Sequence, residues 1–212
     1  VTNIVTDRNQ LSAMVKMAKE ALAVEQIDVI ADRGYFSGEQ ILACEAMGAT
    51  TYVPKPLTCG AKAAGRFGKE DFIYVASENA YRCPAGETLH YRMTTIEKDQ
   101  TLHSYWTTRC SQCALKTRCT TGKEGRIKRW EHEAVIDAMQ QRLDRAGDSM
   151  NIRRRTVEHP FGTLKAWMGA THFLTKGKKC VATEMSLSVL AYNLKRVIAI
   201  LGVRPLIAAL KA

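Results

Sequence analysis

The chain has 212 residues, of which 46% are hydrophobic and 25% charged, a composition typical of a globular protein. No stretch approaches the roughly 18 consecutive apolar residues of a membrane span, and the N-terminus lacks a signal-peptide pattern, so we expect a cytoplasmic protein with no membrane partner. The chain has seven cysteines, and three of them fall between Cys110 and Cys119, which favours reduced thiols or a metal site over a disulfide framework.

The formal net charge of +10 is concentrated in two parts of the chain. Residues 109–130 hold seven Lys and Arg residues against Glu124 alone, and residues 142–179 hold nine against three acidic residues. Localised positive charge favours DNA or RNA as a partner, because each phosphate that a protein neutralises releases counterions. A soluble protein with basic faces is the alternative that charge alone leaves open.

The beginning of the chain alternates helical and strand-like patterns. Apolar residues at helical spacing predict an amphipathic helix over 9–23, and IDVIA at 27–31 predicts a buried strand. Ser37 and Gln40 then have the spacing of a capping box at the start of a second helix. TTYVPKP at 50–56 predicts another strand, which its prolines end. Helix, strand, helix and strand in this order predict the α/β fold class.

Residues 57–130 break this pattern and are interpreted as an insertion. They are rich in Gly, Thr, Cys and Arg, with short strand-like runs such as DFIYVA. Helical periodicity then returns in three segments, at 131–145, 149–168 and 183–201. Thr183 is a candidate N-cap of the last helix, and Gly202 is placed to end it.

Asp32 follows the first predicted strand, in the sequence ADRGY. Ligands and catalytic groups collect at the carboxyl ends of strands in α/β sheets, which makes Asp32 a candidate catalytic residue. Gly34 would let the backbone turn sharply or approach a ligand closely. The alternative is an aspartate that only caps the turn.

Glu158 stands among basic residues in the sequence RRRTVEHPFGTLK. At about 100° per residue, one arc of the predicted helix holds Asn151, Arg154, Glu158 and Lys165. The neighbouring apolar arc is expected to pack on the sheet and holds Val157, Phe161, Leu164 and Met168. Pro160 is expected to kink or restart the helix. A solvated Arg154–Glu158 ion pair at i,i+4 is the alternative to a functional role.

Four cysteines of the insertion are candidate ligands of a zinc ion: Cys83, Cys110, Cys113 and Cys119. Cys110 and Cys113 have the two-residue spacing of a zinc knuckle, and the other two could complete a four-thiolate tetrahedron. Such a site would explain how a segment too polar for a core of its own stays ordered. A metal-free or redox-active thiol group is the alternative. Cys44, Cys59 and Cys180 are expected to be ordinary buried thiols.

These motifs resemble those of DDE-type bacterial insertion-sequence transposases. Asn151, Arg154, Glu158 and Lys165 have the spacing Y-(2)-R-(3)-E-(6)-K, which marks the last catalytic carboxylate in that group. ADRGY around Asp32 is similar to the segment that carries the second aspartate. EHPFGTLKAWMG, EMSLSVLAYNLKRVI and the cysteine-bearing insertion resemble one branch of the group, so the likeness covers essentially the whole chain. Asn151 replaces the tyrosine of the motif and cannot stack on a base.

The resemblance implies a ribonuclease H-like catalytic domain, formed by 1–56 and 131–212 and interrupted by the insertion at 57–130. Asp32 and Glu158 would be catalytic carboxylates that bind Mg²⁺ or Mn²⁺. The residues implied to contact DNA are Asn151, Arg154, Arg155 and Lys165. DNA would be the partner of the complete protein, a homodimer associated with the nucleoid in a bacterial cytoplasm.

The family's first aspartate should precede the first helix, where this chain has only VTNIVT before Asp7. We therefore expect this chain to be the C-terminal part of a transposase and a poor nuclease in isolation. Two other interpretations are also consistent with the sequence. One is a nucleic-acid-binding remnant without catalysis, and the other is a zinc-thiolate redox or scaffold protein without a nucleic acid partner.

Overall fold

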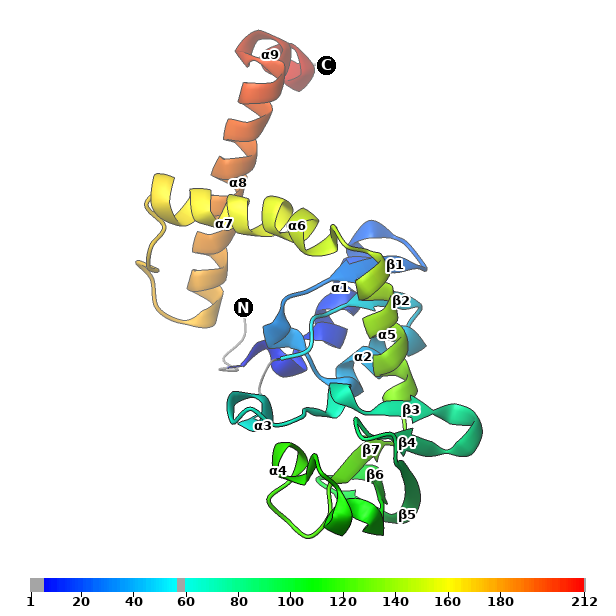
Figure 1. Ribbon diagram of the computed structural model, residues 1–212. Coiled ribbons are helices and arrows are strands. Elements are labelled where there is room, and N and C mark those ends of the chain that lie inside the picture. The colour runs from blue at the N-terminus through cyan, green and yellow to red at the C-terminus, as the bar shows by residue number, and fades with distance from the viewer. Residues whose placement is uncertain (1–5, 57–59, 212) are drawn as a thin grey trace. The chain divides into compact units, whose positions relative to one another are not determined.

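The computed structural model describes residues 6–56 and 60–211 of the chain (Figure 1). The chain divides into two compact units. The first unit, Arg8–Leu143, holds both β-sheets and the insertion. The second, called the helical unit below, consists of the residues from Asp144 onward together with those up to Asp7, and its described part contains only helices and their connections.

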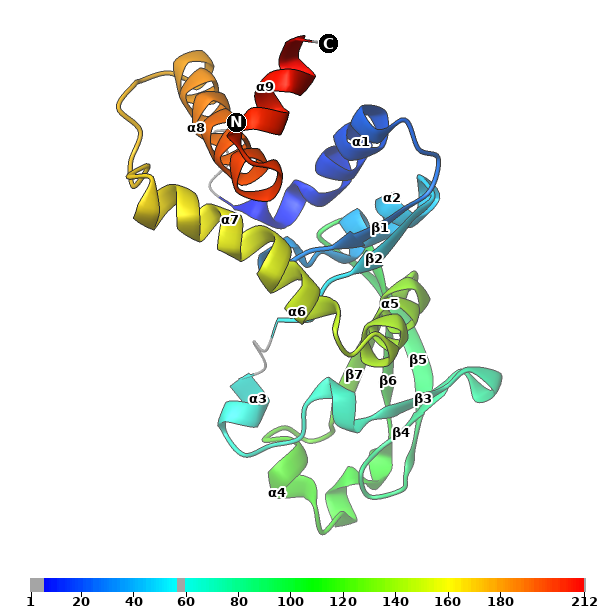
Figure 2. The same ribbon diagram turned by 90° about the horizontal axis from the view of Figure 1, so that it is seen from above.

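The first unit begins with a small α/β layer (Figures 1 and 2). Strands β1 (Ile27–Ile30) and β2 (Ala49–Tyr52) pair in parallel, with Ile27 opposite Ala49. Helix α2 (Gly38–Ala46) connects the two strands and packs on α1 (Leu11–Leu22) and on β2. The predicted order of helix, strand, helix and strand is therefore confirmed.

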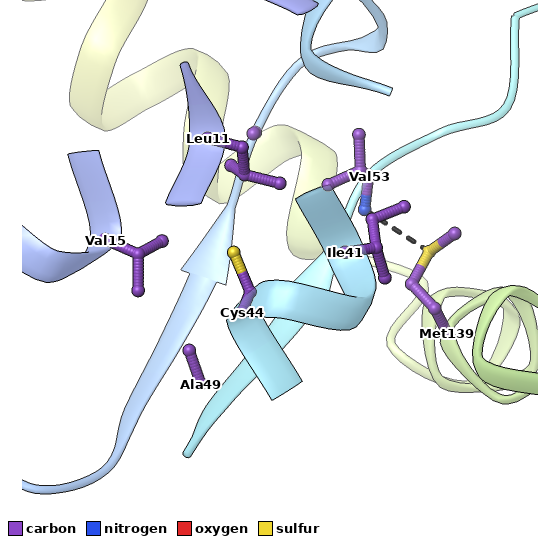
Figure 3. Close-up of a cluster of buried hydrophobic side chains, with 8 residues drawn as sticks. Leu11, Val15, Ile41, Cys44, Ala49, Val53 and Met139 are labelled. Carbon is purple, nitrogen blue, oxygen red and sulfur yellow. Dashed lines mark hydrogen bonds between the residues drawn. The ribbon is translucent and has the colours of Figure 1, made fainter. Parts of the chain in front are cut away.

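An apolar cluster fills the interior of this layer (Figure 3). Its buried members are Leu11, Val15, Ala31, Ile41, Cys44, Ala49, Val53 and Met139. Met139 belongs to helix α5 (Glu133–Arg145), far along the chain, and its Sδ accepts a hydrogen bond from the backbone N–H of Val53 at 3.5 Å. Helix α5 thus closes the core that the N-terminal elements begin.

The capping box predicted at Ser37 and Gln40 does not form. Ser37 is the N-cap residue of α2, but its side chain makes no capping hydrogen bond. Gln40 Oε1 instead accepts hydrogen bonds from the backbone N–H of Ser12 at 3.0 Å and from its hydroxyl at 2.8 Å. The first turn of α1 lacks a side-chain cap of its own, and Gln40 satisfies one of its free N–H groups from the neighbouring helix.

The insertion forms a five-stranded antiparallel sheet. Its strands follow one another in sequence order: β3 (Ile73–Val75), β4 (Ala80–Arg82), β5 (Thr88–Glu97), β6 (Gln100–Trp106) and β7 (Arg126–Trp130). A second apolar cluster consists of Phe72, Tyr81, Leu89, Tyr105 and Ile127. The expectation that this segment is too polar for its own core is therefore wrong, because large aromatic rings supply the buried area.

Arg129, near the end of β7, ties the insertion to α5. Its side chain is buried, and its two terminal nitrogens donate hydrogen bonds to the Tyr81 hydroxyl at 3.3 Å and to Asp137 Oδ2 at 2.8 Å. The guanidinium carbon also lies 3.8 Å from the ring centroid of Tyr74. Arg129 therefore connects two strands of the insertion to the helix that closes the first core.

Trp130 makes the second connection between the insertion and the α/β layer. A Cβ atom added to Gly38, the first residue of α2, would lie 2.9 Å from the indole ring and 3.0 Å from Ile136 Cδ1. The backbone N–H of Trp130 donates to Glu133 Oε2 at 2.9 Å. Glu133 also forms an ion pair with Lys69. Only glycine leaves the indole room to pack at the start of α2.

The helical unit begins with a long segment of unusual helical pattern. It consists of α6 (Ser149–Arg153), the π-helical turn η6 (Arg154–Glu158), α7 (His159–Gly162) and the π-helical turn η7 (Thr163–Trp167). The predicted helix at 149–168 forms, and the disturbance expected from Pro160 takes the form of widened turns. Pro160 has no N–H to donate to the carbonyl of Thr156, and the π pattern before it accommodates that loss.

Helices α8 (Lys178–Leu201) and α9 (Val203–Lys211) complete the helical unit. Helix α8 begins before the N-cap predicted at Thr183, whose hydroxyl donates instead to the Lys179 carbonyl at 3.1 Å. Gly202, at φ 82°, ends α8 as predicted. Cys180 is exposed on α8, so the expectation of a buried thiol is wrong there. Cys44 is buried as expected, and Cys59 lies outside the described residues.

Over residues 6–56 and 60–211, no single helix is long and apolar enough to cross a membrane. Helices α8 and α9 meet the criteria of length and composition only as a pair, which is bent by 110°.

Candidate functional site

Asp32 lies directly after β1, at the carboxyl end of the parallel strand pair. Its Oδ1 accepts a hydrogen bond from the backbone N–H of Gly34 at 2.8 Å and caps the 3-10 turn η2 (Arg33–Tyr35). A Cβ atom at position 34 would lie 3.0 Å from the same oxygen, so glycine keeps the carboxylate uncrowded. Capping and a catalytic role are therefore compatible, because the cap fixes the carboxylate at the strand end.

Glu158 is the last residue of the π turn η6, and its side chain is 53% exposed. Its Oε1 accepts a hydrogen bond from Arg153 Nη1 at 2.8 Å. The alternative expected from the sequence, an ion pair with Arg154 at i,i+4, does not form. A π turn closes five residues along the chain, so it brings residue 153 over residue 158 in place of residue 154.

Three cations around Glu158 have no acidic partner within the part of the chain that the structure describes: Arg154, Arg155 and Lys165. All three are exposed. Asn151 is also exposed, and its Nδ2 donates to Asp148 Oδ1 at 2.9 Å. Unpaired, exposed cations are available to bind phosphate without first breaking an ion pair.

The apolar arc predicted beside Glu158 is only partly correct. Leu164 is buried, whereas Val157 is 39% and Phe161 is 47% exposed. The wheel at about 100° per residue assumed a regular α-helix, and two π turns change the angle between successive residues.

The two candidate catalytic carboxylates belong to different units, Asp32 to the first unit and Glu158 to the helical unit. Among the residues with described positions, no group of three or more His, Cys, Asp and Glu side chains is placed to hold a metal ion.

The four candidate zinc ligands of the insertion line one small cavity, of about 30 Å³. Cys83 follows β4, Cys110 lies in the 3-10 turn η5 (Thr108–Gln112), Cys113 follows that turn and Cys119 ends helix α4 (Lys116–Cys119). The pKa of the Cys119 thiol is raised by burial and by its neighbours Cys110, Cys83 and Cys113. The thiols thus lie within electrostatic reach of one another.

Sequence reasoning missed the structural role of Arg129, which it counted only as part of a basic block. Burial acts to lower the pKa of Arg129, but the hydrogen bonds to Tyr81 and Asp137 outweigh it and raise the pKa above its usual value. The available signal was the strand period of two, which places Arg129 on the same face of β7 as the buried Ile127.

The chain is thus a mixed α/β protein with an antiparallel insertion, and its candidate carboxylate Glu158 stands among unpaired cations. The family model described as transposase DDE domain matches residues 82–198, more than half of the chain, and the chain belongs to this family. The matched region includes Glu158 and the four cysteines, and it confirms the resemblance to DDE-type transposases. Transposases act on DNA, so membership of the family implies a DNA partner. No curated protein and no solved structure matches the chain.

Proposed function

We propose that this chain is part of a metal-dependent DNA transposase, which cleaves phosphodiester bonds and joins DNA strands at the ends of an insertion sequence. The observation that carries the proposal is the transposase DDE domain match, which spans Glu158 and the unpaired cations beside it. Asp32 precedes the matched residues, and its place at a strand end supports the same function.

The donor chemistry of Asp32 and Glu158 fits magnesium or manganese. Both residues offer carboxylate oxygens, the ligands that hard divalent cations prefer. Bound divalent ions supply stabilisation of the attacking and leaving oxygens in an in-line displacement at phosphorus. Asp32 would hold its ligand oxygens in place through the Gly34 hydrogen bond. Glu158 would exchange its ion pair with Arg153 for metal coordination.

The cations next to Glu158 would position the DNA. Arg154 and Arg155 can each bind a phosphate through two parallel hydrogen bonds, and Lys165 would act as a positive point charge. Asn151 would add a polar contact. These residues would hold the scissile phosphate beside the carboxylates.

We further propose that the mixed α/β first unit and the helical unit together form a ribonuclease H-like catalytic domain, which acts as a homodimer on paired DNA ends in a bacterial cytoplasm. A DDE site uses three carboxylates, and only Asp32 and Glu158 are assigned in this chain. The isolated chain is therefore expected to nick DNA weakly or not at all.

Iron-directed protein cleavage tests the metal site without requiring catalysis. Fe²⁺ replaces Mg²⁺ at a carboxylate site, and with ascorbate and peroxide it generates radicals that cut the nearby backbone. The expected result is cutting near residues 32 and 158 that excess Mg²⁺ suppresses and that Asp32→Asn or Glu158→Gln abolishes. Backbone cutting at other positions, or cutting that neither substitution changes, would overturn the assignment of these carboxylates.

A second candidate function is DNA binding without catalysis, and the exposed, unpaired cations favour it. Under this alternative, the affinity for DNA would be intact in Asp32→Ala and Glu158→Ala, and divalent ions would not change it. Under the transposase proposal, Mg²⁺ or Ca²⁺ strengthens DNA binding by the native chain and has no such effect on Glu158→Ala. Fluorescence anisotropy with labelled DNA distinguishes the two.

A further inference from the structure

We propose that the insertion binds one zinc ion through four thiolates and that this ion fixes the loops at one end of the five-stranded sheet. The ligands are Cys83, Cys110, Cys113 and Cys119. Neither membership of a transposase family nor DNA cleavage at carboxylates assigns this site, so the inference stands apart from the proposed function.

Two separate connections of the sheet bring these thiols together. Cys83 lies between β4 and β5, Cys110 and Cys113 lie after β6, and Cys119 lies before β7. All four line the same cavity. The other cysteines with described positions lie elsewhere, Cys44 in the core of the α/β layer and Cys180 on α8. Convergence of thiols from two connections is what a structural site that cross-links loops requires.

Short turns fix the backbone at three of the four cysteines. The carbonyl of Cys83 accepts the N–H of Gly86 at 2.8 Å, and Gly86 has a φ of +82°, which favours glycine. The carbonyl of Cys110 accepts the N–H of Cys113 at 3.4 Å, and the carbonyl of Cys113 accepts the N–H of Lys116 at 3.2 Å. Each of these cysteines thus begins a tight turn, which limits the directions that its thiol can take.

The lining of the cavity selects the metal. Apart from the thiols, its lining is mostly apolar, with Phe67, Phe72 and Leu89 among its members, and the described lining residues include no carboxylate and no imidazole. A set of sulfur ligands without oxygen ligands disfavours magnesium and calcium and favours zinc.

In the described part of the chain, no three of these thiols lie close enough together to hold a metal ion. With zinc–sulfur bonds of about 2.3 Å, a tetrahedral site holds its sulfurs about 3.8 Å apart. Zinc binding must therefore draw the loops inward. The segments that carry these thiols allow this, because η5 and α4 contain no buried residue.

The charge of the surrounding loops matches a four-thiolate zinc site. Four thiolates around a divalent ion carry two net negative charges. The connection between β6 and β7 carries four cations, Arg109, Lys116, Arg118 and Lys123, and one acidic residue, Glu124, while the connection between β4 and β5 adds Glu87. Lys116 lines the cavity itself, and Arg118 lies 4.9 Å from the ring centroid of Phe67, another lining residue. Without a negative centre, these cations would repel one another and loosen the loops.

Metal analysis of the full chain tests this inference. The chain is purified under reducing conditions without chelator, and its metals are measured by mass spectrometry. The expected result is one zinc per chain, lost in Cys113→Ser and retained in Cys180→Ser, which removes an exposed thiol outside the insertion. Zinc retained in Cys113→Ser, or iron together with acid-labile sulfide in the native chain, would overturn the proposal.

Cobalt substitution keeps the test decisive if Cys113→Ser fails to fold. The native chain is stripped with a chelator, reduced and titrated with Co²⁺. A four-thiolate site gives intense sulfur-to-cobalt charge-transfer absorption and visible tetrahedral bands that saturate at one equivalent and disappear on addition of Zn²⁺. Absence of these bands while circular dichroism shows a folded chain contradicts the site. Because neither readout involves DNA or the carboxylates, the outcome is independent of the transposase proposal.

Discussion

Arg153 and Glu158 form an ion pair across a π-helical turn, with Nη1 and Oε1 2.8 Å apart. A regular α-helix would turn residue 153 away from residue 158, so the pair depends on the widened turn. In the proposed site, the same carboxylate binds a divalent ion. The adjacent guanidinium would therefore compete with the metal.

Replacement of Arg153 by glutamine should tighten metal binding at Glu158. Loss of a neighbouring positive charge at an exposed site is worth about 1 kcal/mol, or about fivefold in affinity. The measurement is the Fe²⁺ concentration that gives half-maximal backbone cutting near residue 158. The control is Arg155→Gln, which removes an unpaired cation from the same turn. If the half-maximal Fe²⁺ concentration shifts equally in both variants, the Arg153–Glu158 ion pair has no specific influence on metal binding.

Truncation of Met139 to alanine should strongly destabilise the first unit. The side chain is fully buried and joins α5 to the core of the α/β layer (Figure 3). Truncation of a buried methionine to alanine typically lowers the free energy of unfolding by roughly 2–5 kcal/mol. Urea denaturation followed by circular dichroism measures the loss. Met17→Ala, at a position 63% exposed on α1, is the control and should change stability by less than about 0.5 kcal/mol.

The insertion should lose stability in alkaline solution. The pKa values of Tyr81 and Tyr105 are both raised from the ordinary value of 10 to about 12, mainly because the two phenols are buried. A phenol whose pKa is higher in the folded state stabilises that state fully below pH 10, and this contribution is lost as the pH rises toward 12. Fluorescence of Trp106 and Trp130, on β6 and β7, reports the unfolding of the insertion in urea.

Tyr81→Phe should make this loss of stability shallower between pH 10 and pH 12, because phenylalanine has no proton to lose. A urea midpoint that stays constant over this range in the native chain would contradict the prediction.

Replacement of Lys165 by glutamine should weaken DNA binding for all sequences alike. Each phosphate contact that is lost lowers the slope of log affinity against log salt by about 1. The slope is measured by fluorescence anisotropy at several salt concentrations. Lys16→Gln removes one exposed charge from α1 and should leave the slope as it is. Parallel changes in the two variants would favour a response to net charge over a contact at Lys165.

Replacement of Gly125 by alanine should weaken the proposed zinc site. The added Cβ would lie 3.1 Å from the Sγ of Cys119, so the thiol must shift. Displacement of one ligand in this way is expected to speed the loss of zinc to a chelator by about tenfold. Gly122→Ala is matched to it, since its Cβ would approach nothing closer than 3.5 Å. Unchanged zinc loss in Gly125→Ala would contradict the placement of Cys119 among the ligands.

The sequence predicted the parts of the fold that depend on local pattern. Apolar periodicity identified α1, β1 and β2, and the place of Asp32 after a strand followed from the same pattern. One predicted capping interaction and one predicted helix start are wrong. Gln40 caps Ser12 of another helix. Helix α8 begins at Lys178, before the N-cap residue predicted at Thr183.

Other features depend on geometry that the sequence does not express directly. The core of the insertion was missed because tyrosine counts as partly polar, whereas the rings of Tyr81 and Tyr105 pack edge to face with centroids 5.1 Å apart. The partner of Glu158 was misjudged because a wheel drawn for an α-helix does not anticipate the π turns on either side of Pro160. The cysteine spacing, by contrast, indicated thiols that the structure does gather around one cavity.

The packing of Trp130 against Gly38 limits how chimaeric proteins can be built from relatives of this chain. A chimaera that joined residue 56 directly to residue 131 would lose the indole that packs against Ile136 and the start of α2. It would also leave Asp137 without the guanidinium of Arg129. The insertion and the α/β layer therefore share their boundary residues, and an exchange between relatives would have to carry Gly38, β7 and the first turns of α5 as one inherited block.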